Sequence, residues 1–93
     1  MALLDCSVSD GPRPGYKNVV VRSSQNSTEQ FSIEERFLKL VSNGIYKLPV
    51  RVIEIIRKEE LFLVQLPVEA DSGANRVFVP KRSLTFSPEE API

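Results

Sequence analysis

The stretch between residues 48 and 86 most constrains how this chain can fold. It contains three apolar runs, VRVIEIIR (50–57), LFLVQL (61–66) and RVFVP (76–80). Val and Ile lose side-chain freedom in a helix and fit the pleated surface of a sheet. The first two runs therefore predict a long antiparallel hairpin. The third predicts a shorter strand that ends at Pro80 or lies at an edge, because proline cannot donate a hydrogen bond to a neighbouring strand.

A helix over residues 51–66 is the competing interpretation of the same stretch. Pro49 and Pro67 would suit its two ends, and the charged segment RKEE (57–60) is a good helix former. Glu60, however, interrupts the apolar face that such a helix would need. The density of β-branched residues in the first run favours the hairpin.

Two segments upstream also have strand patterns. Residues 2–8 alternate between apolar and polar side chains, which predicts a half-buried strand, with a mobile terminus as the alternative. Three consecutive valines predict a strand over residues 16–23, and residues 29–33 are suited to return as the second strand of a hairpin. The Pro- and Gly-rich segment 9–15 predicts a rigid connecting loop.

The best helix prediction covers residues 33–42. One apolar stripe at helical spacing is formed by Ile33, Phe37, Leu40 and Val41. Ser32 and Glu35 are spaced as a capping box, and Asn43-Gly44 follows as a helix stop. Phe31 also suits a strand, so the boundary between strand and helix stays open. We expect the apolar stripe of this helix to pack on the sheet.

Together these segments predict a single α+β domain over residues 1–86. We expect a small, mostly antiparallel sheet of five or six strands with one helix at about residues 33–42. Residues 81–86 predict one tight helical turn before a last short strand. The tail SPEEAPI (87–93), with two prolines and two acids, predicts disorder.

From Pro49 to Phe86 the predicted order is a long hairpin, a loop, a short strand, a helical turn and a last strand. This order resembles the second half of an SH3-like small barrel, which implies that the sheet curls into an open barrel. The aromatic-rich peptide-binding pattern of signalling SH3 domains is missing. The resemblance therefore implies no functional residues.

The composition excludes several classes of functional site. The chain has no histidine and a single cysteine, Cys6, so it offers no disulfide and none of the usual zinc, copper or iron sites. Acidic neighbours raise the pKa of a thiol and disfavour Cys6 as a nucleophile. No phosphate-binding glycine loop or dinucleotide motif occurs. We therefore expect no enzymatic activity, no catalytic residue, no metal or other cofactor and no small-molecule substrate.

The sequence also predicts a cytoplasmic protein that does not act at a membrane. The segment MALLDCSVSD lacks a basic region, and its apolar run breaks at Asp5, unlike a signal peptide. No apolar stretch approaches the roughly 18 residues of a membrane span. A single cysteine fits a reducing compartment.

The predicted function is a non-enzymatic binding module that contacts another protein or a second copy of itself. One short helix would not cover both faces of a sheet whose strands are apolar on two sides. We expect the uncovered face to meet the partner. Its candidate residues are Ile53 and Ile55, together with Phe62 and Val64.

Binding to nucleic acid is the alternative function. The sequence RVFVPKR would place Phe78 outward near Arg76, Lys81 and Arg82. A sheet presents a stacking ring and phosphate contacts to a single strand in this way. Arg51 and Arg57 could add positive charge. The formal net charge of zero and the single aromatic ring rank this function second, and a buried Phe78 among solvated basic side chains is the simpler interpretation.

Overall fold

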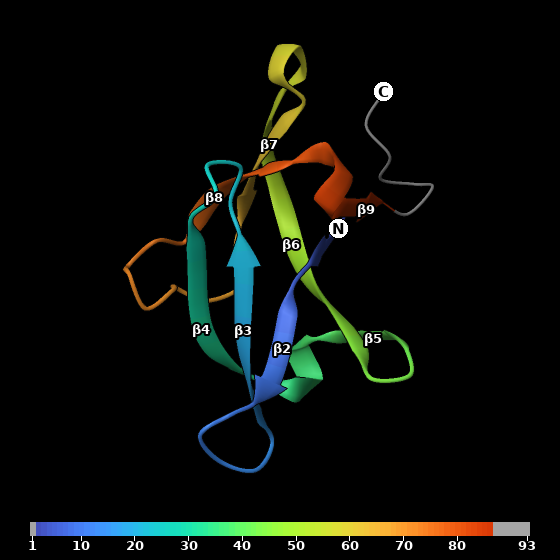
Figure 1. The fold of residues 1–93 in the computed structure, drawn as a ribbon, viewed down its shortest axis with the longest axis vertical. Helices are drawn as coiled ribbons and strands as arrows, with labels where there is room; N and C mark the ends of the chain where they lie inside the picture. Colours follow the sequence, from blue (N-terminus) through green and yellow to red (C-terminus); the bar gives the residue numbers. More distant parts are fainter. Residues whose placement is uncertain (1, 87–93) are drawn as a thin grey trace.

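The computed structural model describes residues 2–86, which form nine strands in two antiparallel sheets (Figure 1). The strands are β1 (Ala2–Asp5), β2 (Ser7–Asp10), β3 (Tyr16–Arg22), β4 (Thr28–Glu34), β5 (Lys39–Ser42), β6 (Ile45–Ile56), β7 (Leu61–Gln65), β8 (Arg76–Pro80) and β9 (Leu84–Phe86). Three single 3₁₀ turns are η1 (Glu35–Phe37), η2 (Arg57–Glu59) and η3 (Lys81–Ser83). The tail predicted over 87–93 lies outside the described residues.

The larger sheet has six strands in the order β8-β7-β6-β1-β9, with β5 also paired to β6. The smaller sheet has the order β2-β3-β4 and lies over part of the larger one (Figure 1). Only Cys6 separates β1 from β2, so the chain passes from one sheet to the other within a single residue. Both sheets are therefore covalently joined at the start of the chain.

A single hydrophobic core joins the inward faces of the two sheets. Its members alternate with outward residues along each strand, as the period of two in a strand requires. The buried residues are Ala2, Leu4, Val19, Val21, Phe31, Ile33, Leu38, Leu48, Val50, Phe62, Val64, Leu66, Ala70, Val77 and Val79. Buried apolar area of this kind is the main favourable contribution to folding.

A one-residue bulge at Ile53 explains why the run 50–57 is apolar on both faces. Val52 lies opposite Val64 before the register shift, and Ile55 lies opposite Phe62 after it. The extra residue changes which side chains point inward. Val52 and Ile55 therefore both pack against the core, while Ile53 is 38% exposed.

The predicted helix at residues 33–42 is wrong, and with it the α+β class. These residues belong to β4, η1 and β5, and no α-helix occurs between residues 2 and 86. Strand β4 pairs along its whole length with β3, which satisfies the backbone groups that a helix would have bonded internally. The expected capping box is absent because the Ser32 hydroxyl donates to Asn18 Oδ1 at 2.8 Å and the Glu35 carboxylate accepts from Tyr46.

The prediction of a single SH3-like open barrel is also wrong, because the strands divide into two separate sheets and form no closed barrel. The predicted order of elements after Pro49 is confirmed. The hairpin β6–β7 replaces the alternative helix over 51–66, β8 is an edge strand, and η3 precedes β9. The single strand predicted over residues 2–8 is divided at Cys6 into β1 and β2, which belong to different sheets, and β2 continues to Asp10 in the segment predicted as a loop. The valine-rich hairpin is confirmed as β3 and β4.

Truncating one buried and one exposed leucine tests this arrangement. Leu48→Ala should lower the free energy of unfolding by about 2–5 kcal/mol, because Leu48 is fully buried and the change leaves a cavity. Leu40→Ala removes the same atoms from a 54% exposed side chain and should change that free energy by no more than about 0.5 kcal/mol within a single chain. Urea unfolding followed by circular dichroism measures both, at a protein concentration low enough that contacts between chains do not contribute. A helix packed on the sheet would instead make Leu40→Ala costly.

Candidate functional site: two exposed surfaces and a basic hollow

Arg76 and Phe78 point outward from β8, while Val77 and Val79, which alternate with them, are buried. Phe78 is 36% exposed and lies opposite Leu63 of β7. The structure therefore places Phe78 on the outer face of the six-stranded sheet and not in the core. In the neighbouring row of this face, Gln65 lies between Arg51 and Arg76, so two guanidinium groups come from β6 and β8.

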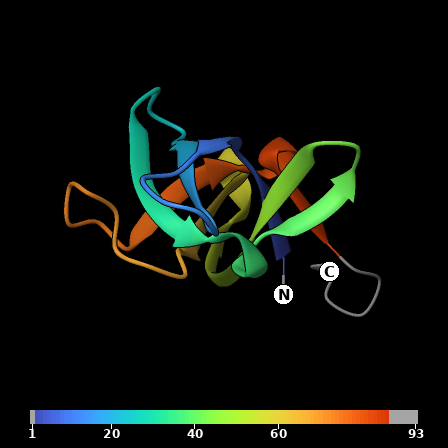
Figure 2. The ribbon, with the colours of Figure 1, turned by 90° about the horizontal axis from the view of Figure 1, so that it is seen from below.

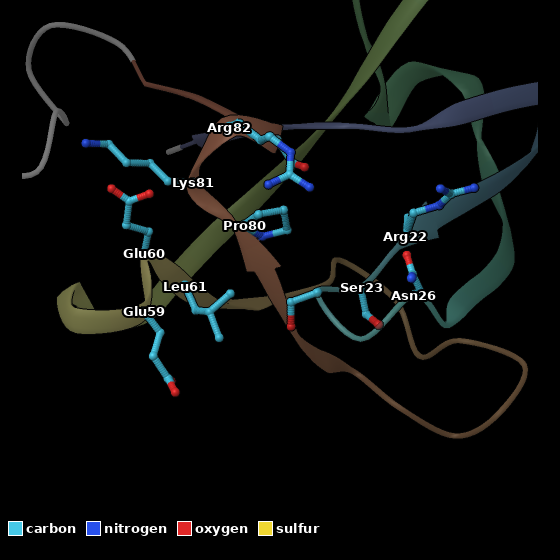
Figure 3. A pocket seen from close by; sticks show the side chains of 11 residues that line it. Arg22, Ser23, Asn26, Glu59, Glu60, Leu61, Pro80, Lys81 and Arg82 are labelled. Carbon is cyan, nitrogen blue, oxygen red and sulfur yellow. The ribbon is translucent and has the colours of Figure 1, made fainter.

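Lys81 and Arg82 lie beyond the end of β8, in η3, and line a separate hollow of about 500 Å³ (Figure 3). Arg76 and Phe78 line a second, smaller hollow of about 200 Å³. Ser23 and Ser24 line both. The four residues predicted as one basic and aromatic patch are therefore divided between two neighbouring hollows.

The loop between β3 and β4 is the wall shared by these hollows. The backbone N–H of Ser24 donates to the carbonyl of Phe78 at 2.8 Å, which fastens the loop to the edge of β8. Within the loop, the Ser23 N–H donates to the Ser27 carbonyl at 2.8 Å, and the two hydroxyls lie 2.6 Å apart. These contacts bring Arg22, at the end of β3, to the hollow that contains Arg82.

The most exposed apolar surface lies elsewhere, on residues 37–45, here called the apolar hairpin. It comprises the last residue of η1, β5, the turn at Gly44 and the first residue of β6. Of the six large hydrophobic residues that are exposed between residues 2 and 86, four belong to it, namely Phe37 (46% exposed), Leu40 (54%), Val41 (43%) and Ile45 (55%). Figure 2 shows this hairpin in green at the periphery of the fold. Within residues 2–86, β5 pairs with β6 alone, so its other edge is open.

Three contacts hold the base of the apolar hairpin. Leu38 is buried in the core, and the Glu35 N–H donates to the carbonyl of Gly15 at 2.9 Å. The Tyr46 hydroxyl donates to Glu35 Oε2 at 2.6 Å. This hydrogen bond, together with burial, raises the pKa of Tyr46, so the phenol stays a donor at neutral pH. The position of the hairpin is thus fixed while its apolar side chains stay exposed.

The apolar hairpin differs from the expectation for this segment, because Phe37, Leu40 and Val41 also fit the buried stripe of a helix. The signal that could have found it is Asn43-Gly44 between two apolar runs, which is a strong hairpin pattern. The same pair also fits a helix stop. In the structure Gly44 has φ +70°, a value that glycine adopts without strain.

The structure does not bring the other predicted partner residues onto one open face. Ile53 is exposed at the bulge, whereas Ile55 is half-buried and packs against the core. Phe62 and Val64 are almost fully buried, so the prediction that they line an uncovered face is wrong. Arg57 lies in η2, away from the row that contains Arg51.

Cys6 is held as a neutral thiol. Burial, and then the nearby Asp5 carboxylate, raise the pKa of Cys6 from 9.0 to about 11, against an opposing backbone hydrogen bond from Leu48. The predicted direction is confirmed, although burial contributes more than the acidic neighbour. Cys6 Sγ lies 3.8 Å from the carbonyl of Tyr46, to which the thiol donates.

Thiol reactivity tests this environment. The thiolate is the reactive form, and a shift from 9.0 to about 11 lowers its fraction near pH 7.5 about 100-fold relative to the urea-unfolded chain. Because a more basic thiolate is also a stronger nucleophile, the rate of labelling should fall by at least about tenfold. The rate for the folded protein should rise with pH up to about 11. Stopped-flow labelling with a disulfide reagent measures both. Equal rates for folded and unfolded chains would contradict the assigned environment.

Residues 2–86 contain no group of three or more His, Cys, Asp or Glu side chains placed to hold a metal ion. No helix in the described part of the chain is long and apolar enough to cross a bilayer. No family model, no curated protein and no solved structure matches this chain.

Proposed function

We propose that this protein is a non-enzymatic interaction module that self-associates through the apolar hairpin. The observation that carries the proposal is the exposure of four large apolar side chains around β5, a strand with one open edge among the described residues. Soluble monomers rarely expose large contiguous apolar patches. An open edge strand also presents unpaired backbone groups that readily bond to another strand.

A second copy of the chain is the partner that suits this edge. In an antiparallel pairing centred on Leu40, Leu40 meets Leu40 of the second copy and Lys39 meets Val41. Lys39 is the only charged residue of β5, so this register places no like charges opposite each other. The formal net charge of zero adds no general repulsion between copies. The resulting interface is isologous, as in most homodimers.

Introducing a charged side chain into the apolar hairpin tests the proposal. Leu40→Lys should convert a dimer of two 10.4 kDa chains into a monomer, because it places an ammonium group at the centre of the apolar contact. The measurement is light scattering coupled to size exclusion, over a concentration series that reaches the high micromolar range.

Ile53→Lys is the matched control, since Ile53 is an exposed large apolar residue outside the hairpin. This variant should remain dimeric. A wild-type protein that stays monomeric throughout the series would refute self-association. A dimer that survives Leu40→Lys but not Ile53→Lys would move the interface to the bulge in β6.

A second candidate function is binding of single-stranded nucleic acid to the outer face of β7 and β8. The specific observation is the outward ring of Phe78 beside a row that contains Arg51, Gln65 and Arg76. A base can stack on the ring while the guanidinium groups contact backbone phosphates. A single aromatic residue gives this surface a small stacking area, which ranks it second.

This candidate predicts weak, salt-sensitive binding. A fluorescent mixed-sequence oligonucleotide should bind at low salt, and Phe78→Ala should weaken binding without changing its salt dependence. Arg76→Gln should reduce the slope of log affinity against log salt by about 0.7, as expected for one lost phosphate contact on a single strand. Fluorescence anisotropy measures both. If no binding is detected at about 20 mM salt, the nucleic-acid function is excluded.

A further inference from the structure

The turn between β5 and β6 places Asn43 and Gly44 at the tip of the apolar hairpin. Figures 1 and 2 show this turn projecting from the rest of the fold. Both residues are exposed, and a Cβ placed on Gly44 would meet no atom within 4 Å. Solvent therefore surrounds the tip of the turn.

The polar groups at this tip have no partner within the described chain. The pairing of β5 with β6 ends at Ser42 and Ile45, so Asn43 and Gly44 lie beyond the last strand pair. Among residues 2–86, the Gly44 N–H donates no backbone hydrogen bond in a turn or loop, and the Asn43 amide makes no side-chain hydrogen bond. The Gly44 nitrogen is therefore free to react with the side chain that precedes it.

We infer that Asn43 converts spontaneously to aspartate and isoaspartate by ring closure with Gly44. Hydroxide removes the Gly44 N–H proton, and the nitrogen attacks Cγ of Asn43. The new N–Cγ bond closes a succinimide ring, while the side-chain amide nitrogen takes a proton from water and leaves as ammonia. A second water opens the ring at either carbonyl, which gives aspartate or isoaspartate. Glycine favours the attack because it has no side chain to crowd its nitrogen.

The other three asparagines lack this combination of features. Asn18 lies within β3, where its Nδ2 donates to the Asp10 carbonyl at 3.0 Å and its Oδ1 accepts from the Ser32 hydroxyl at 2.8 Å. Asn26 and Asn75 are followed by serine and arginine, whose side chains crowd the attacking nitrogen. Conversion should therefore be confined to Asn43.

Asp10-Gly11 is the other pair in the sequence that could close the same ring. Its groups are both engaged, because the Gly11 N–H donates to the Tyr16 carbonyl at 3.0 Å and Asp10 Oδ1 pairs with Lys17 Nζ at 3.2 Å. The local structure thus separates two chemically similar dipeptides.

Conversion of Asn43 adds a negative charge to the surface that we propose for self-association. In the antiparallel pairing centred on Leu40, position 43 lies opposite Phe37 of the second copy. A carboxylate beside this apolar contact loses hydration, so converted chains should associate more weakly. This consequence rests on the proposed function, whereas the conversion itself does not.

Incubation of the full chain at neutral pH and body temperature tests the inference. Cleavage after lysine and arginine places each of the four asparagines in a separate peptide, with Asn43 in residues 40–47. The mass of this peptide alone should rise by the difference between water and ammonia, faster at higher pH. Electron-transfer fragmentation should identify both products. The rate should lie within about tenfold of that of a synthetic peptide of residues 39–47, because an exposed turn opens at little cost.

Two variants test the mechanism. Gly44→Ala has space for its methyl group but crowds the attacking nitrogen, so conversion should slow by at least about tenfold. Asn43→Gln keeps an amide whose ring closure would need a larger ring, so it should show no conversion at position 43. Dispersed ¹H–¹⁵N spectra show that both variants are folded.

Three results would overturn the inference. The first is conversion of Asn43 in the folded chain more than about tenfold slower than in the peptide, which would mean that the turn protects it. The second is equal conversion at Asn26 or Asn75. The third is aspartate without isoaspartate, which indicates direct hydrolysis of the amide and not ring closure.

Asn43→Asp tests the consequence for self-association. It should raise the dissociation constant of the dimer by at least about threefold in light scattering, because it places a carboxylate at the apolar contact. Asn43→Gln, the uncharged control, should leave that constant unchanged. Equal constants for both variants would refute the effect on the dimer. A monomeric wild-type protein would refute self-association and this effect, whereas the peptide masses would still decide the conversion.

Discussion

The long strand β6 is hydrogen-bonded to three other strands, and the rest of the structure depends on this pairing. Its first part pairs with β1 on one side and β5 on the other, and its last part pairs with β7. The bulge at Ile53 separates these parts and keeps apolar side chains pointing into the core on both sides of it. Pairing with β6 fixes the position of β1. Because only Cys6 separates β1 from β2, this pairing also fixes where β2, and with it the smaller sheet, begins.

The two candidate sites lie in opposite halves of the molecule along its long axis, which measures 41 Å. In Figure 1 the apolar hairpin with β5 is in the lower half, and the loops of the basic hollow, between β3 and β4 and after β6, are in the upper half. A dimer joined at β5 would therefore present two separate basic hollows, one in each copy.

Local sequence patterns predicted most strands correctly. They failed where pairing with a strand distant in the sequence selects the secondary structure. The β-branched run before residue 57, and the alternation that points Phe78 outward, were sufficient to predict β6 and the outer face of β8. The stripe from Ile33 to Val41 fits a helix equally well in sequence, and only pairing with β3 and β6 selects strands. Likewise, Lys81 and Arg82 were predicted as basic contacts, but Arg22 joins them through the bond between Ser24 and Phe78, 54 positions apart, which no local pattern encodes.

The position of β1 between β6 and β9 has a consequence for how the protein folds. Ala2 lies opposite both Val50 and Phe86, so the first strand is completed by one of the last described residues. Closing so long a loop costs chain entropy before the contact returns any stability, which slows folding. During synthesis the β3–β4 hairpin can form early, whereas β1 keeps one open edge until β9 has left the ribosome. Strand β1 is thus made before the other strands of its sheet but is one of the last of them to be protected, and a nascent chain exposes its edge throughout that interval.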